Sequence, residues 1–97
     1  MIITRGLDRK DGTTLIGDKY AECKWLLSKN RLMINLMVWA NKESKEKGFS
    51  YITNFVDFKL RYYIELTEEE TEILSDEAVE YFLTKEINKT YGKGTIN

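Results

Sequence analysis

Few residues in this chain have side chains suited to catalysis, and they are widely spaced. The sequence contains no histidine and a single cysteine, Cys23. Without histidine, the commonest general base and the commonest zinc ligand are missing, and no Ser-His-Asp or Cys-His site can form. Cys23 alternates with Ala21 and Trp25 on one apparent face, which predicts a buried thiol rather than a nucleophile. We therefore expect no catalytic residues and no enzymatic activity.

Carboxylates and glycines form clusters, but their spacings are not typical of a metal or nucleotide site. Asp8 and Asp11 flank a turn without the regular ligand series of a calcium loop. The glutamates at 68–70 and 72 lie at a predicted helix start, where the helix dipole favours negative charge. Glycines at positions 6, 12 and 17 form no dinucleotide-binding fingerprint, and no phosphate-binding loop is present. We expect no metal, no cofactor and no small-molecule substrate.

Length and charge limit the classes of function further. Ninety-seven residues fit one domain, and the net charge of −1 gives no overall attraction to nucleic acid or to an anionic membrane. The charge is uneven, because residues 1–66 have a net charge of +4 and residues 67–97 one of −5. No secretory signal is recognised and no apolar run is long enough to span a bilayer. We therefore expect a protein that is made and assembled in the cytoplasm.

The segments that must position any site have a clear β pattern. Apolar residues take every second position in Arg31–Ala40 and in Phe58–Leu66, which predicts two half-buried strands. Lys19–Leu27 also alternates, although its spacing fits a helix as well. The short turn Ser28-Lys29-Asn30 favours a strand and a hairpin, with Asn30 able to adopt a left-handed conformation.

The remaining N-terminal and central segments are less regular. Met1–Thr4 is a short β-prone run, and the glycine-containing stretch 5–17 is predicted to be an arm. Asn41–Gly48 is a charged connection with room for one helical turn. Phe49–Phe55 is expected to return as β structure. The alternation breaks after it, which predicts a bulge or kink near Val56 or Asp57.

The C-terminal third changes to a helical pattern. Thr67 and Glu70 form a capping-box sequence for a first helix that ends near Leu74, and Ser75 is placed to cap a second one. Gly92 is expected to end the second helix, and Lys93–Asn97 to fray. The apolar stripe of the second helix consists of Val79, Phe82, Leu83 and Ile87.

Together these elements predict an α+β domain. We expect a mostly antiparallel β-sheet of four or five strands with one or two C-terminal helices packed on one face. The single domain, 1–97, is divided into an arm (1–18), the sheet (19–66), the helices (67–91) and a tail (92–97). The helical stripe is expected to be buried with the strand residues Leu32, Ile34, Leu36, Val38, Leu60 and Ile64.

The second face of the central strand is the candidate protein interface. Met33, Met37 and Trp39 lie opposite the residues of the predicted core. Trp and Met are enriched at the centres of interfaces. With the adjacent lysines of the charged loop they give the candidate interface Met33, Met37, Trp39, Lys42, Lys45 and Lys47. The alternative is a central strand covered on both faces, with Trp39 in the core.

A short segment suggests an alternative in nucleic-acid binding. Lys47-Gly48-Phe49-Ser50-Tyr51-Ile52 resembles the RNP1 strand of RNA-recognition-motif domains. The resemblance implies that Phe49 and Tyr51 would stack on bases and that Lys47 would contact a phosphate. The same residues also fit a charged hairpin loop followed by an ordinary strand.

A second resemblance covers about residues 19–90. A β-hairpin, the Lys/Glu loop 41–48, further strands, the helix start Leu66-Thr67-Glu68-Glu69-Glu70 and an amphipathic helix are similar to small structural proteins of tailed-phage virions. The resemblance implies a tail, baseplate, neck or capsid-associated subunit that binds other virion proteins or copies of itself and is found in the virion. Alternatives are an RNA-binding module and a small phage inhibitor of a host protein.

Overall fold

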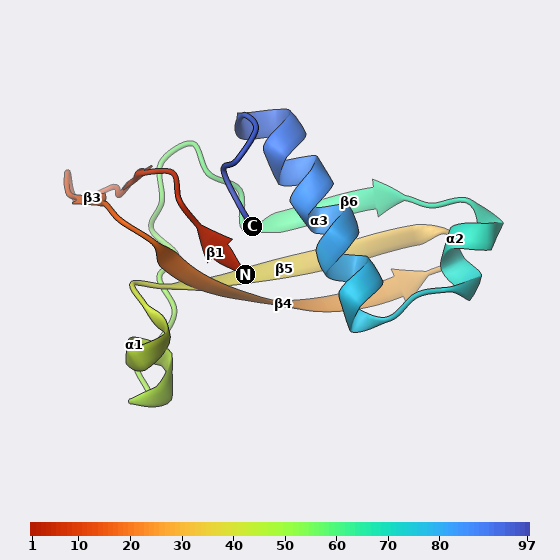
Figure 1. Ribbon diagram of the computed structural model, residues 1–97, viewed down its shortest axis with the longest axis horizontal. Coiled ribbons are helices and arrows are strands. Elements are labelled where there is room, and N and C mark those ends of the chain that lie inside the picture. The colour runs from red at the N-terminus through yellow and green to blue at the C-terminus, as the bar shows by residue number, and fades with distance from the viewer.

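A computed structural model describes all residues from Met1 to Asn97 and shows an α+β fold (Figure 1). Four strands form an antiparallel sheet in the order β1-β4-β5-β6, and β2 and β3 form a separate two-stranded ribbon. The predicted fold class is therefore confirmed. The elements are β1 (Ile2–Ile3), β2 (Leu7–Asp8), β3 (Thr14–Leu15), β4 (Lys19–Ser28), β5 (Arg31–Trp39), α1 (Lys42–Glu46), β6 (Arg61–Glu65), α2 (Glu68–Glu72) and α3 (Asp76–Tyr91).

The hairpin of β4 and β5 forms the centre of the sheet. Lys19–Ser28 is a strand, as the alternating pattern indicated, and it pairs with β5 from Tyr20↔Trp39 to Ser28↔Arg31. The two-residue turn differs in one detail from the prediction. Lys29, rather than Asn30, is left-handed, with φ 56°. A two-residue turn whose first central residue has positive φ follows the natural twist of the paired strands, and that position belongs to Lys29.

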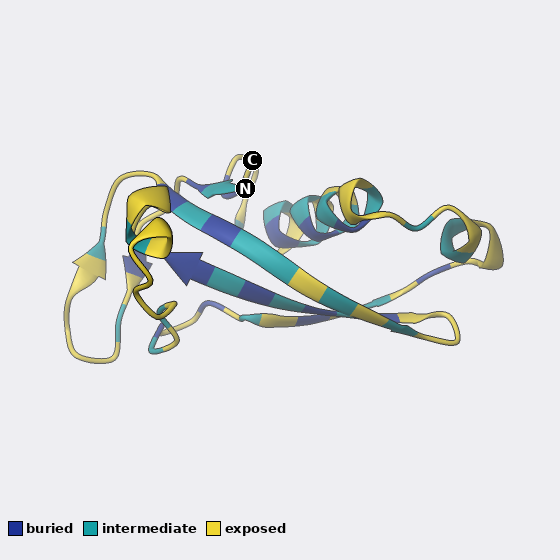
Figure 2. Ribbon diagram, turned by 90° about the horizontal axis from the view of Figure 1, so that it is seen from below, coloured by how far each residue is buried: buried dark blue, intermediate teal, exposed yellow.

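The core lies between α3 and one face of the sheet, and α3 does not cover the other face (Figure 2). Val79, Leu83 and Ile87 of α3 are fully buried. Buried sheet residues on this side include Ala21, Leu32, Ile34, Leu36, Val38 and Tyr62. The predicted core is thus confirmed in its centre. Leu60, Ile64 and Phe82 are only partly buried, because they lie at the β6 border, where nothing beyond the sheet covers them.

Side-chain caps fix the two C-terminal helices. Thr67 and Glu70 form the predicted capping box of α2, with Thr67 N–H donating to Glu70 Oε1 at 2.9 Å. Ser75 Oγ accepts from the Ala78 amide at 3.2 Å and starts α3. Gly92, with φ 117°, ends α3 as predicted. These bonds satisfy amide groups that a helix end would otherwise leave unpaired.

Both ends of the chain are ordered, the N-terminal arm in keeping with the prediction and the C-terminal tail against it. The expected arm contains the β2–β3 ribbon, and its Leu7 is 2% exposed in the core. The C-terminal residues do not fray, because Asn97 N–H donates to Ile2 O at 2.8 Å and Ile96 is fully buried. The Asn88 side chain also bonds both main-chain groups of Ile96. The tail therefore closes the outer edge of β1.

The segment between α1 and β6 is where the predicted β structure is wrong. Residues 49–60 contain only isolated bridges, Ile52↔Val38 and Arg9↔Phe55, and β6 begins at Arg61 rather than Phe58. The predicted kink is present, since Asp57 has φ 56°. Lys10 N–H donates to Asn54 O at 2.8 Å and attaches this segment to the β2–β3 ribbon, while Ile52 N–H donates to Val38 O at 2.8 Å and attaches it to the end of β5.

Candidate functional site: the uncovered face of the sheet

The sheet face opposite α3 has a helix against it only at its Trp39 end, where α1 contacts β4 and β5 (Figure 2). It presents Tyr20, Glu22, Lys24 and Leu26 from β4, Met33, Asn35, Met37 and Trp39 from β5, and Arg61, Tyr63 and Glu65 from β6. Alternation along each strand places these residues together, because their neighbours point into the core. We call this surface the open face.

A row of apolar side chains crosses the open face near the β4–β5 turn. Leu26 lies opposite Met33, and Met33 lies opposite Tyr63. Leu26 is 60% exposed and Tyr63 is 50% exposed, while Met33 between them is half-buried. Cross-strand neighbours on one face are in direct contact range, so the three side chains form one continuous strip. We call it the apolar row.

Charged groups border the apolar row at β6. The Arg31 guanidinium lies 4.4 Å from the centroid of the Tyr63 ring, and Arg31 Nε is 3.6 Å from Glu65 Oε1. Arg61 Nε donates to Asn35 Oδ1 at 2.9 Å in the next row of the sheet. These contacts hold long side chains against the sheet, which reduces the conformational entropy that a partner would have to remove on binding.

A hollow of about 370 Å³ lies beside these groups on the open face. Lys24 and Arg61 supply its positive charge, and Met37 and Tyr51 supply apolar and aromatic surface. The hollow is open to solvent and receives no carboxylate from the residues that line it. Its chemistry suits an acidic or aromatic group of a partner rather than a cation.

At the other end of the open face, Trp39 is covered by its own chain. It is 7% exposed, its indole Nε1–H donates to Phe49 O at 2.8 Å, and its ring contacts Tyr20 and Tyr51, with centroids 6.1 and 5.9 Å away. The segment after α1 folds back over the indole. Trp39 is therefore placed as the alternative interpretation had it, in a small second core, and does not offer an exposed anchor.

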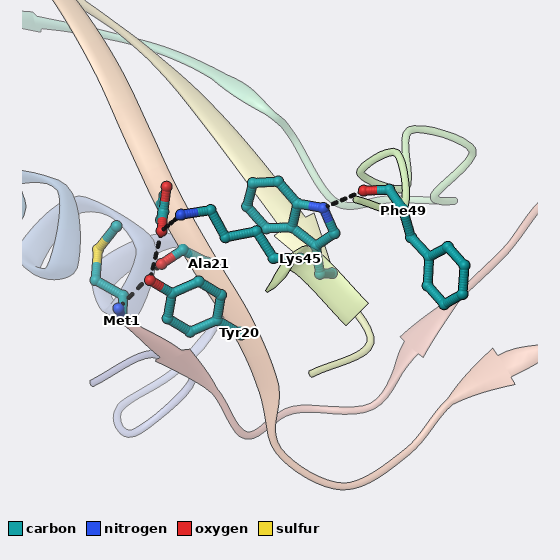
Figure 3. A network of polar contacts seen from close by, with 7 residues as sticks. Met1, Tyr20, Ala21, Lys45 and Phe49 are labelled. Atoms are coloured by element: carbon teal, nitrogen blue, oxygen red, sulfur yellow. Dashed lines mark hydrogen bonds and ion pairs between the residues drawn. The ribbon is translucent and has the colours of Figure 1, made fainter. Parts of the chain in front are cut away.

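The candidate lysines of the charged loop make contacts within the chain, and Figure 3 shows those of Lys45. Lys45 Nζ lies 2.7 Å from Glu22 Oε2, and the same carboxylate accepts from Tyr20 Oη at 2.5 Å. Lys42 lies 5.9 Å from the Tyr20 ring centroid, and Lys47 pairs with Glu43 at 2.9 Å. The network attaches α1 to β4, so these lysines stabilise the cover of Trp39. Met33 and Met37 remain half-buried on the open face.

The network shifts the acid–base behaviour of its members. The Lys45 ammonium, followed by the Tyr20 hydroxyl, lowers the pKa of Glu22 from its ordinary 4.5. The adjacent Glu22 carboxylate raises the pKa of Tyr20 to about 12. Both shifts describe one arrangement, in which ionised Glu22 accepts hydrogen bonds from two sides.

The Glu22 contacts predict a small dependence of stability on pH. Because the pKa of Glu22 is lower in the folded state, its contribution is complete above its ordinary pKa and is lost as the pH falls through the lowered value. We expect Glu22→Gln to cost about 0.2–1 kcal/mol at pH 7, as for exposed ion pairs. The difference from the unsubstituted protein should vanish at an acidic pH below the lowered pKa of Glu22, where the carboxyl is protonated. Urea unfolding of both proteins at the two pH values measures this. An equal difference at both would contradict the role of the charge.

The residues of the RNA-binding alternative are not arranged as a stacking platform. Phe49 is 62% exposed and Tyr51 is 47% exposed, but both lie in an irregular segment and not on a strand. The edge of Tyr51 packs against Trp39. Two bases cannot stack on these rings as they would on neighbouring positions of a sheet, so the strand context that the RNP1 resemblance implies is wrong.

The other chemical candidates also have structural partners. The Cys23 thiol is half-buried, and burial raises its pKa to about 11, which disfavours the reactive thiolate. Hydrogen bonds from the Thr13 hydroxyl and amide lower the pKa of Asp11 and tighten its turn. No group of three or more His, Cys, Asp or Glu residues is placed to hold a metal ion.

Eight of the eleven open-face residues named above were not among the predicted interface residues. Among them, Leu26, Arg61 and Tyr63 become neighbours of Met33 and Asn35 only through strand pairing. The position of Leu26 beside Met33 could have been predicted from the sequence, because a two-residue turn at 29–30 fixes these two residues opposite each other. The position of β6 beside β5 could not be predicted, because 21 residues that include α1 and an irregular segment separate the two strands.

Comparisons of this chain with known protein families, with characterised proteins and with solved structures found no match. None of its helices has the length and apolar character needed to cross a bilayer.

Proposed function

We propose that this chain is a non-enzymatic structural protein of a phage particle that works through protein–protein contacts in an assembly. The observation that carries the proposal is the apolar row, in which Leu26, Met33 and Tyr63 cross three strands on the face opposite α3. A continuous exposed strip of large apolar side chains is characteristic of a surface that binds another protein. The virion location rests on the resemblance in element order described above.

The surroundings of the row favour a protein partner over a small ligand. The row lies on the exposed strand surface, bordered by Arg31 and by the Lys24–Arg61 hollow, and a small molecule would leave most of it in water. An apolar centre with a charged, hydrated border is the usual organisation of a protein interface. The expected partners are other virion proteins or copies of this chain.

The docking role of the open face is tested with Leu26→Glu. Because Leu26 is 60% exposed, the substitution is expected to change the free energy of unfolding by no more than about 0.5 kcal/mol. Its charge at the apolar row should weaken co-purification with virion proteins by at least about tenfold. Mass spectrometry of purified particles gives the amount incorporated.

Ile16→Glu is the matched control, since Ile16 is 83% exposed in the loop after β3, away from the open face. It should fold and be incorporated like the unsubstituted protein. Equal incorporation of the two variants would contradict the docking role. Absence of the unsubstituted protein from particles, together with one tight host partner, would favour the inhibitor alternative.

One observation keeps the RNA-binding alternative open at a different place from the one the sequence suggested. Lys24, Arg61 and Tyr51 meet at the hollow on the open face, and positive charge beside an aromatic ring suits a single strand. Such binding would fall steeply with salt. Salt-sensitive binding of single-stranded RNA that is lost in the double variant Lys24→Ala/Arg61→Ala would replace the structural role with this alternative.

A further inference from the structure

The outer border of β6 is an unpaired strand edge (Figure 1). Leu66 N–H donates to Asn30 O at 2.8 Å, so the even-numbered residues of this segment bond to the β5 side. The main-chain groups of Arg61, Tyr63 and Glu65 therefore point away from the sheet, and all three residues are exposed. Each offers one N–H and one C=O that no part of this chain pairs.

We propose that β6 pairs with β6 of a second copy in an antiparallel, two-fold symmetric dimer centred on Tyr63. Symmetry then places Arg61 opposite Glu65 of the second copy, and Glu65 opposite its Arg61. Pairs of opposite charge directly across antiparallel strands are attractive. In this register every outward main-chain group of the three residues is paired. A shift by one symmetric step places Glu65 opposite either Tyr63 or Lys59 of the second copy, and the Lys59 amide already donates to Tyr91 Oη within its own chain.

The same register makes the apolar row continuous between the two copies. Tyr63 of one copy lies opposite Tyr63 of the other, so the strip Leu26–Met33–Tyr63 continues through the symmetry axis into its own repeat. An isologous interface requires one patch to be complementary to itself. The edge of β6 is complementary to itself in two respects, because Tyr63 meets Tyr63 at its centre and Arg61 meets Glu65 on either side.

Charges on an edge strand usually oppose pairing with other chains. Here the two charges have opposite signs and are placed at equal distances on either side of Tyr63, so two-fold pairing matches them. The opposite side of the sheet, where β4 extends beyond the residues that pair with β1, lacks this property. Glu22, Asp76 and Glu80 line a hollow beside it, and pairing β4 with itself would bring these carboxylates together.

The dimer rests on the proposed role in assembly, and charge exchange tests it separately from that role. Sedimentation equilibrium of the purified chain should show a dimer. Arg61→Glu and Glu65→Arg each place like charges opposite each other at both positions, and each should raise the dimer dissociation constant by about tenfold or more. The double variant Arg61→Glu/Glu65→Arg exchanges the two charges and should dimerise like the unsubstituted protein.

Mixing the two single variants gives the sharpest measurement, because their edges are complementary to each other and should form a heterodimer. Lys10→Glu, the same charge change at an exposed position in the turn of the β2–β3 ribbon, is the control and should leave dimerisation unchanged. A melting curve for each variant shows that the fold is retained. If a single variant melts early, Glu65→Gln repeats the comparison with a milder change.

A monomer at every concentration, a dimer that both single variants retain, or open-ended assemblies larger than a dimer would each overturn the proposed pairing. The role in a particle is tested independently by incorporation. A monomeric chain that is still incorporated would refute the dimer alone. A dimer that is absent from particles would refute the role in the particle alone.

Discussion

Replacing Leu36 with alanine is expected to lower the free energy of unfolding by about 2–5 kcal/mol. Leu36 is 2% exposed in the core cluster that the sheet forms with α3. Truncation removes buried methyl groups and leaves a cavity that the sheet and helix cannot fully close. A domain of this size has a total stability of only about 5–15 kcal/mol, so the loss is a large fraction of it. Urea unfolding with the slope held in common gives the difference.

Leu26→Ala is the matched control for this result. Both leucines lie in the same hairpin, but Leu26 is on the open face and 60% exposed. Its truncation should cost no more than about 0.5 kcal/mol. Equal losses for the two variants would contradict the assignment of the two faces, and a near-normal Leu36→Ala would contradict the position of the core.

The elements that the sequence predicted well are those whose periodicity and local bonds decide their structure. Alternation in β5 places Leu32 and Ile34 in the core, and the stripe on α3 buries Val79 and Leu83. Helix starts were predictable for the same reason, because Ser75 bonds an amide only three residues away. Such patterns depend on near neighbours and can be recognised without knowing the rest of the fold.

The errors fall where distant contacts decide the structure. Phe49–Phe55 has β-forming residues, but its neighbours in space are the β2–β3 ribbon and the end of β5. The C-terminal tail looked unstructured because its order comes from Ile2, at the opposite end of the chain. Local propensity has little weight against such tertiary contacts.

In the candidate site, too, the residues placed by local alternation were predicted and those placed by distant contacts were not. The sequence placed Met33 and Met37 on the second face of β5, and the structure leaves both there, half-buried. It could not show that Trp39 is covered, because the cover comes from the irregular segment after α1. The charged residues of β6, Arg61 and Glu65, are likewise plain in the sequence. Their possible role in pairing depends on β6 being the strand at the border of the sheet, and periodicity does not determine which strand that is.

Trp39→Ala is expected to lower the free energy of unfolding by about 3–5 kcal/mol, as for other large buried aromatic residues. The indole fills the space between Tyr20 and Tyr51, and its loss also leaves Phe49 O without its donor. The segment after α1 should then lose its attachment and become susceptible to proteolysis near Phe49. Thermal unfolding and limited proteolysis measure the two effects separately.

Trp39→Phe separates packing from hydrogen bonding at this position. It keeps an aromatic ring against Tyr51 but removes the Nε1–H donor, so we expect an intermediate loss that includes about 1 kcal/mol for the missing hydrogen bond. A stable, protease-resistant Trp39→Ala protein that fails only in assembly would contradict this result. Trp39 would then belong to the interface, because its contribution would appear in association and not in folding. The burial of the indole and its bond to Phe49 favour the opposite outcome, a loss of stability that precedes any loss of assembly.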